Sequence, residues 1–131
     1  MSVRARFETK GFEAYLEAIA RAGEDVDAAA AEALQAGGEI LLAGMQKRVP
    51  KDTGNLHDNL TIEGPHQDAN YHYVIIGLAK SADAKTARYG NAQEYGTSSM
   101  AAHPFVRPTL ESDISKARRA MRDVFKSKGV L

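Results

Sequence analysis

The residues best suited to chemistry in this sequence are its four histidines and the acids near them. The histidines are His57, His66, His72 and His103. None belongs to a His-x-x-x-His or His-Glu-x-x-His pattern, so no helix is expected to direct two imidazoles at one metal ion. Cysteine is absent, which excludes disulfides, thiol catalysis and cysteine-ligated metal. We therefore expect no metal and no cofactor, and we interpret the histidines as solvated or sheet-edge residues.

Glu94 and His103 are the best candidates for an acid/base pair, because a carboxylate and an imidazole can exchange a proton near neutral pH. The alternative is that Glu94 accepts hydrogen bonds from backbone amides of its own turn, and we favour that structural role. Ser98 and Ser99 follow Gly96, but no Gly-x-Ser-x-Gly elbow and no preceding hydrophobic strand mark them as nucleophiles. No phosphate-binding loop is present. The sequence therefore predicts a protein without enzymatic activity.

A basic cluster near the C-terminus is the third chemical feature. Its core consists of Arg118, Arg119, Arg122 and Lys126. At helical spacing these side chains lie close together on one side, where they could line a path for DNA or face an acidic partner. Lysine plus arginine equals aspartate plus glutamate at 17 each, so the whole molecule has no net attraction to nucleic acid or to an anionic membrane. We favour a solvated helix face and keep the basic lining as an alternative.

Length and composition fit one domain over residues 1–131. The apolar fraction of 44% and the charged fraction of 26% are ordinary for a globular protein. No apolar signal segment follows Met1, and no apolar run approaches the roughly 20 residues of a membrane span. We expect a soluble cytoplasmic protein.

The first half of the chain predicts one strand and two helices. Apolar residues alternate over residues 3–9, which is typical of a half-buried strand, and a short helix follows over residues 12–23. A longer helix is expected from Glu24 or Asp25 to Pro50. Its seam is rich in alanine and glycine, including Gly37, so another backbone can approach closely. We expect this seam to pack on the domain's own sheet, with a neighbouring subunit as the alternative.

The second half predicts two strands, a loop and a helix. Strands are expected at residues 56–62 and 71–78, separated by a turn at Gly64-Pro65. Residues 79–91 are poor in apolar side chains and predict a long, exposed and mobile loop. The last helix is expected to start near Pro108. The order predicts an α+β fold, with a small, mostly antiparallel sheet packed by the long helix and the C-terminal helix.

Two segments rich in turn-forming residues connect these predicted elements. Residues 50–56 contain Pro50 and Gly54, which suit a turn after the long helix. Residues 93–108 combine Gly96 with Pro104 and Pro108, which restrict the backbone without making it regular. Stiff irregular loops hold a corner of a fold or present a surface to a partner.

These two segments resemble a known family. Val-Pro-x-Asp-Thr-Gly-x-Leu at residues 49–56, followed by Glu-Tyr-Gly-Thr-Ser-x-Met-x-Ala-His-Pro-Phe-Val-Arg-Pro at residues 94–108, is similar to the gene-ten-like family of neck and tail-completion proteins of lambdoid siphophages and prophages. The resemblance covers nearly the whole chain. The sequence departs from the family at His57, where arginine is common, and at Asn59, where serine is common.

The resemblance implies a non-enzymatic structural subunit at the phage head–tail junction, forming an oligomeric ring between the head connector and the tail tube. It implies other neck and tail proteins as partners, passage of DNA without sequence-specific binding, and location in the virion after assembly in the host cytoplasm. It also implies structural or interface roles for a set of motif residues. These are Asp52, Thr53, Gly54, Leu56, Glu94, Tyr95, Gly96, Thr97, His103, Pro104, Phe105, Arg107 and Pro108.

Two other functions stay open at this point. One is a DNA-contacting module that uses the basic C-terminal helix, whose affinity would fall steeply with salt. The other is a small hydrolase that uses Glu94 and His103.

Overall fold

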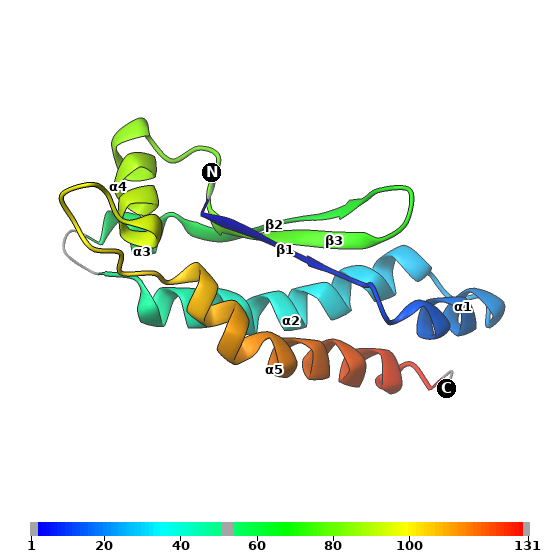
Figure 1. The fold of residues 1–131 in the computed structure, drawn as a ribbon. Helices are drawn as coiled ribbons and strands as arrows, with labels where there is room; N and C mark the ends of the chain where they lie inside the picture. The colour runs from blue at the N-terminus through cyan, green and yellow to red at the C-terminus, as the bar shows by residue number, and fades with distance from the viewer. Residues whose placement is uncertain (1–2, 51–53, 130–131) are drawn as a thin grey trace.

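The structure is a computed structural model that describes residues 3–50 and 54–129. The elements in chain order are β1 (Arg4–Glu8), α1 (Glu13–Arg21), α2 (Val26–Arg48), α3 (Asn55–Asp58), β2 (Leu60–Gln67), β3 (His72–Leu78), α4 (Ala84–Tyr95) and α5 (Val106–Ser127). Figure 1 shows a sheet above the long pair α2 and α5, with α4 at one end and α1 at the other. The α+β prediction is confirmed.

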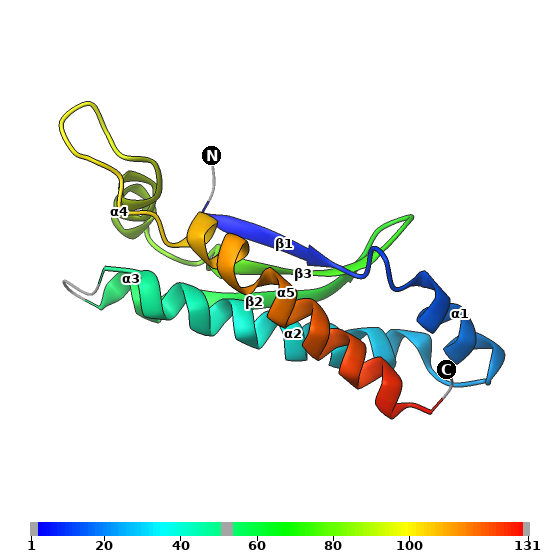
Figure 2. The ribbon, with the colours of Figure 1, turned by 60° about the horizontal axis from the view of Figure 1, so that its bottom comes forward.

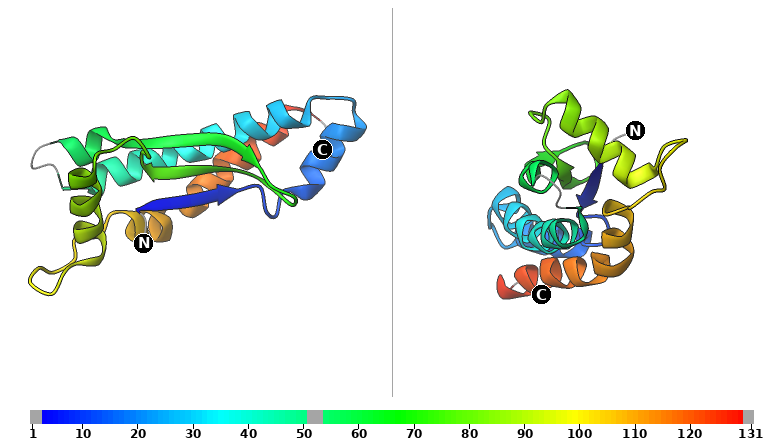
Figure 3. Two further views of the ribbon diagram at one scale, coloured as in Figure 1. Left: turned by 90° about the horizontal axis from the view of Figure 1, so that it is seen from above. Right: turned by 90° about the vertical axis from the view of Figure 1, so that its left-hand side faces the viewer.

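The sheet is antiparallel, in the order β1-β3-β2. Its core face carries apolar side chains such as Phe7, Val74 and Ile76, each at most 2% exposed. This face packs on α2, whereas the view from above in Figure 3 shows the opposite face without a helix over most of its length. The alternation in β1 therefore has its expected cause, since every second side chain enters the core.

Two glycines of α2 allow close packing in the body of the molecule, by which we mean the sheet with α1, α2 and α5. A Cβ on Gly37 would overlap the Phe7 ring and the carbonyl oxygen of Ala117 in α5. A Cβ on Gly44 would likewise overlap Asp113 and Thr109. At Gly37 the small residues of α2 thus pack on the domain's own sheet, as predicted. At Gly44 they pack on α5, which the prediction did not include.

Polar contacts fix the ends of α2. The Asp25 carboxylate caps the N-terminus by accepting from Ala28 N at 3.0 Å. At the other end, Arg48 Nη1 donates to Asp113 Oδ2 at 2.9 Å and to Thr109 Oγ1 at 3.2 Å. Arg48 therefore ties the end of α2 to the first turns of α5.

Several predicted boundaries were wrong. Most of residues 79–91, expected as a mobile loop, belongs to α4, which Asp83 caps by accepting from Thr86 N at 2.7 Å. Helix α4 buries mainly polar residues and glycine, so no apolar stripe marked it. The Gly64-Pro65 turn lies instead within β2, beside an irregularity between Glu63 and His66.

The first residues of β2 and α5 also differ from those predicted. Residues 55–58 form α3, so β2 begins at Leu60 rather than at residue 56. Helix α5 begins at Val106, two residues before Pro108, because the Glu94 carboxylate accepts from the amides of its first turn. Among the described residues, no helix has the length and apolar character needed to cross a membrane.

Candidate functional site

The two motifs of the sequence meet at one end of the molecule. We call this region the α4 end and define it as residues 54–59 and 79–107. Figure 2 shows α3, α4 and the loop before α5 gathered there. Leu56 is 1% exposed, and a Cβ on Gly90 would lie 3.1 Å from Leu56 Cδ1. The absence of a side chain at Gly90 thus lets α4 pack directly on α3.

Glu94 holds the start of α5 in place. Its Oε1 accepts from the backbone amides of Phe105 and Val106, each at 2.8 Å, and its Oε2 accepts from Arg107 N at 3.0 Å. The carboxylate is buried and satisfies three donors that a helix N-terminus leaves free. Its negative charge also suits the positive end of the helix dipole.

The backbone amides that bind Glu94 do not lie where the sequence analysis predicted them. Its amides do not belong to its own turn, because the chain leaves α4, makes a loop and returns so that residues 105–107 lie over the carboxylate. The His103 amide donates to the Gln93 carbonyl at 2.6 Å, while the His103 side chain is exposed. With both Glu94 oxygens directed at backbone amides, the geometry does not support an acid/base pair of Glu94 and His103.

The loop at residues 96–104 is ordered by its own hydrogen bonds. Thr97 N donates to Met100 O at 2.9 Å, and Met100 N donates back to Thr97 O at 3.3 Å. Gly96 has a φ of 76°, and a Cβ there would lie 3.0 Å from Ala102 N and from Met100 O. The segment is therefore fixed but irregular, and Figure 2 shows it projecting from the body.

The exposed side chains of this loop are mostly small or polar. Thr97, Ser98, Ser99 and His103 are exposed, and Tyr95 is the one large hydrophobic residue that is exposed (49%) within residues 3–50 and 54–129. A shallow hollow lies beside the loop between α4 and Thr97, and Tyr95 and Arg88 line it.

The remaining motif residues have structural positions. Phe105 is fully buried, and its carbonyl accepts from Thr109 Oγ1 at 2.7 Å. Pro104 is half-buried before it, Pro108 lies in the first turn of α5, and Arg107 is exposed with Glu111 3.8 Å away.

The motif before α3 is seen only in part. Gly54 has a φ of 78° and leads directly into α3, as expected of a turn glycine. Asp52 and Thr53 lie outside the described residues.

The basic cluster divides into two kinds of residue. Arg118 donates to the Lys10 carbonyl at 3.2 Å and its guanidinium lies 4.8 Å from the centre of the Phe12 ring. Arg119, Arg122 and Lys126 are exposed on the outer side of α5. Arg118 therefore has a packing role, while the other three form an exposed basic face in which Arg122 Nε lies 3.8 Å from Asp123 Oδ1.

The histidines do not converge on one site. His66 Nε2 lies 3.0 Å from Glu63, and His72 Nε2 lies 2.9 Å from Asp27. Arg4, with His66 as a smaller contribution, lowers the pKa of Glu63. In the part of the chain that the structure describes, no three potential ligands are grouped as a metal site.

Sequence analysis missed a charged network on the open face of the sheet. Arg4 bonds to Glu63 at 2.6 Å, and the Arg6 guanidinium lies 3.7 Å from the centre of the Tyr73 ring while pairing with Asp68. The Tyr71 amide, then Arg6 and the Asn70 amide, lower the pKa of Asp68 to about 2. The alternation of charged residues in β1 was the available signal for this face.

The chain is similar to a known family of proteins. The family model described as "Bacteriophage HK97-gp10, putative tail-component" matches residues 10–96. A search of curated proteins and a search of solved structures found no match.

Proposed function

Because the chain belongs to the HK97-gp10-like family of bacteriophage tail components, we propose that it is a structural subunit of the phage head–tail junction. In this proposal several copies form a ring between the head connector and the tail tube, and other neck and tail proteins bind the ring. The virion is its final location.

The observation that carries the proposal is the architecture of the α4 end. A subunit that joins two assemblies needs a surface whose shape is set before its partner arrives, because ordering a loop on binding costs free energy. Glu94 bonds to three amides, and Thr97 and Met100 bond to each other, so the projecting loop is already shaped in the free chain. The loop offers hydroxyl groups, and Tyr95 is exposed beside it at the end of α4, which suits a polar interface that forms late in assembly.

The electrostatics of this end also agree with a structural role. Both Glu94 oxygens are occupied by amides, so they bind the chain itself rather than a substrate. This removes the main support for the hydrolase alternative, which required Glu94 and His103 to act together.

The direct test is location in assembled particles. We expect gold-labelled antibodies against this chain to mark the junction between head and tail in particles of the phage that encodes it. Deletion of the gene should give filled heads and separate tails, and expression of the wild-type chain should restore joining. Label along the tube or at the tail tip, or normal particles after deletion, would contradict the proposal.

A second candidate, contact with DNA, rests on the exposed face formed by Arg119, Arg122 and Lys126. If this face touches phosphate, affinity for duplex DNA should fall steeply as salt rises. The variant R119E/R122E should lose that binding, whereas R21E/R88E, which changes two exposed arginines elsewhere, should keep most of it. Equal affinities for the two double variants would contradict a basic lining on α5.

A further inference from the structure

The two outer strands of the sheet each have a free edge. In the order β1-β3-β2, strands β1 and β2 each pair only with β3 within the described chain. A strand edge presents backbone N–H and C=O groups that can pair with another chain. Proteins usually protect such edges with proline, bulges or a covering segment.

In β1, the backbone N–H and C=O groups that point away from β3 belong to the charged residues. At the two ends of its ladder, Leu78 N donates to Val3 O at 3.1 Å and Thr9 N donates to His72 O at 3.0 Å. The register between them is unbroken, so alternate residues such as Ala5 and Phe7 direct their backbone groups at β3. The backbone groups of Arg4, Arg6 and Glu8 therefore face outward.

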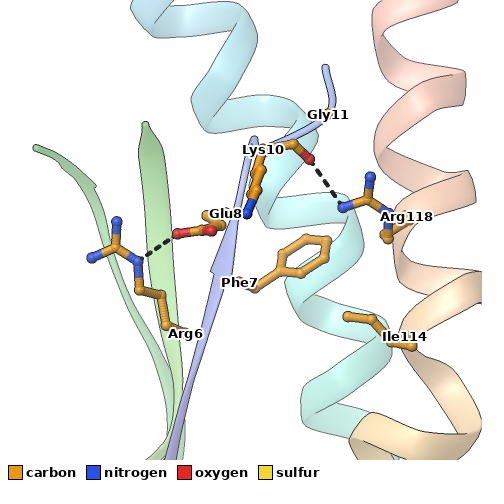
Figure 4. Close-up of a pocket in the computed structure, with 7 residues that line it drawn as sticks. All are labelled: Arg6, Phe7, Glu8, Lys10, Gly11, Ile114 and Arg118. Atoms are coloured by element: carbon orange, nitrogen blue, oxygen red, sulfur yellow. Dashed lines mark hydrogen bonds and ion pairs between the residues drawn. The ribbon is translucent and has the colours of Figure 1, made fainter. Parts of the chain in front are cut away.

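A groove follows this edge of β1. Figure 4 shows it between β1 and α5, with Phe7 on one side and Ile114 on the other. Its volume is about 400 Å³. Arg118 closes one end by donating to the Lys10 carbonyl. The groove is lined by residues 6–8 of β1, and the strand contains neither a proline nor a register shift that would oppose an added strand.

In β2, the backbone N–H and C=O groups that point away from β3 belong instead to residues whose side chains face the core. Ala79 N donates to Asn59 O at 2.8 Å, and the register continues unbroken to Glu63. Thr61 and Glu63 therefore direct their backbone groups at β3, and those of Leu60 and Ile62 face outward. Beyond Glu63 the register shifts and Pro65 lacks an N–H, so the usable edge is residues 60–63.

These two edges fit each other only in parallel. Consider two adjacent parallel strands. A residue whose backbone N–H and C=O groups point toward the other strand lies opposite a residue whose N–H and C=O groups point away from it, and the side chains of these two residues lie on the same face of the sheet. If Arg6 stands beside Thr61 on the open face, Phe7 stands beside Ile62 on the core face. If Arg6 stands beside Glu63, Ala5 stands beside Ile62. Antiparallel pairing would place Ile62 among the charged side chains of the open face.

We propose that β1 of one copy adds in parallel to β2 of a second copy. The contact is heterologous, since each copy uses its β1 edge with one neighbour and its β2 edge with the other. Such a contact forms a ring when the rotation between successive copies closes, as the proposed function requires. It keeps the helices of all copies on one face of the continuous sheet. Arg6 beside Glu63 of the neighbour pairs opposite charges, whereas Arg6 beside Thr61 places Glu8 beside Glu63, so charge favours the first of these two offsets. The inference rests on the proposed function for its ring, and it specifies which edges make that ring.

Cysteine pairs test the contact directly, because the natural chain has no cysteine. The variants R6C and T61C are purified separately, mixed in equal amounts and oxidised. We expect a disulfide-linked dimer in the mixture and none in either variant alone. R6C with E63C covers the alternative offset of two residues, since side chains on one face repeat every second residue. A14C with T61C, which uses an exposed position on α1, is the control for random collision.

A proline substitution tests the backbone rather than the side chain. R6P removes an outward N–H that β3 does not use, so the fold should survive and the oligomer should be lost. R6A removes the same side chain but keeps the N–H, and it should retain the oligomer. Circular dichroism reports whether each variant is folded, and light scattering reports its mass. If R6P does not fold, the disulfide cross-linking experiment alone tests whether β1 pairs with β2 of a second copy.

The outcomes separate this inference from the proposed function. A dimer from R6C alone, loss of the oligomer in R6A, or the absence of both mixed cross-links overturns parallel strand addition. A stable wild-type oligomer without those cross-links leaves the ring standing on other contacts. Particles without label at the head–tail junction overturn the proposed function, whatever the cross-links show.

Discussion

The body and the α4 end are held together by different forces. In the body, α2 buries alanines, leucines, glycines and a methionine against the sheet and α5. In the α4 end, the residues that α4 buries are Thr86, Gly90, Gln93 and Glu94, and only Ala87 and Tyr89 of this helix are partly buried against the apolar core. Its position therefore depends more on hydrogen bonds and on the close approach of Gly90 to the Leu56 side chain. Apolar burial provides most of the free energy of folding, whereas hydrogen bonds contribute less and are directional. We infer that the body supplies stability and the α4 end supplies a defined shape.

The largest expected effect is in the body. Phe125 is fully buried, with its ring 5.7 Å from Phe12 and 5.6 Å from Tyr15 between centroids. Phe125→Ala should lower the free energy of unfolding by about 3–5 kcal/mol, because it removes buried apolar surface and leaves a cavity. Urea denaturation measures the change. Val124→Ala, at the neighbouring half-buried position, should cost about 1 kcal/mol. Similar costs for the two variants would contradict a body stabilised by this core.

The second effect tests the α4 end. Glu94→Ala leaves the amides of residues 105–107 without their acceptor and should cost about 2–3 kcal/mol. Glu94→Gln keeps one acceptor oxygen and should cost less. Hydrogen exchange should rise at residues 105–107 in Glu94→Ala while the amides of α2 stay protected. Glu111→Ala, which changes an exposed acid in α5, is the control and should stay within about 0.5 kcal/mol.

This difference between regions explains how much the sequence predicted. The strands and the long helices followed from side chains such as Phe7, Leu41 and Phe125, which repeat with the period of their element. Helix α4 was missed because its buried residues are polar or glycine, which periodicity does not mark. Asp83 three residues before Thr86 was the one available signal, as a possible N-cap.

The candidate site was predicted only in outline. The sequence identified Glu94 and favoured a role in binding amides, which the structure confirms. It could not identify the amides, because the bonds join residues 11 to 13 positions apart across an irregular loop. The charged face of the sheet likewise depends on the pairing of β1 with β3, which no local pattern specifies.

A smaller effect concerns Gly96, the glycine that opens the projecting loop. Gly96 and Gly23 have nearly equal φ values of 76° and 77°, but a Cβ on Gly96 would lie 3.0 Å from atoms of Ala102 and Met100, whereas no atom lies within 4 Å of a Cβ on Gly23. Gly96 also has a ψ of 176°, which at positive φ is a conformation that only glycine adopts readily. Gly23→Ala should cost about 1 kcal/mol for the left-handed conformation. Gly96→Ala should cost about 1 kcal/mol more, for its backbone conformation and its close contacts together, and shift the amide resonances of residues 97–102. Equal costs would show that the projecting loop does not depend on glycine at position 96.

The smallest effect concerns the β2–β3 turn and depends on pH. The Tyr71 amide, Arg6 and the Asn70 amide lower the pKa of Asp68 from 3.8 to about 2, so the folded chain favours the ionised carboxylate. The resulting stabilisation is complete above about pH 4 and declines as pH falls towards 2, because the unfolded chain takes up the proton first. Asp68→Asn cannot titrate, so its deficit in unfolding free energy should shrink over that interval. A deficit that stays constant between pH 4 and pH 2, or an Asp68 carboxyl that titrates near 3.8 by carbon-13 NMR, would show that the charged face does not hold this turn.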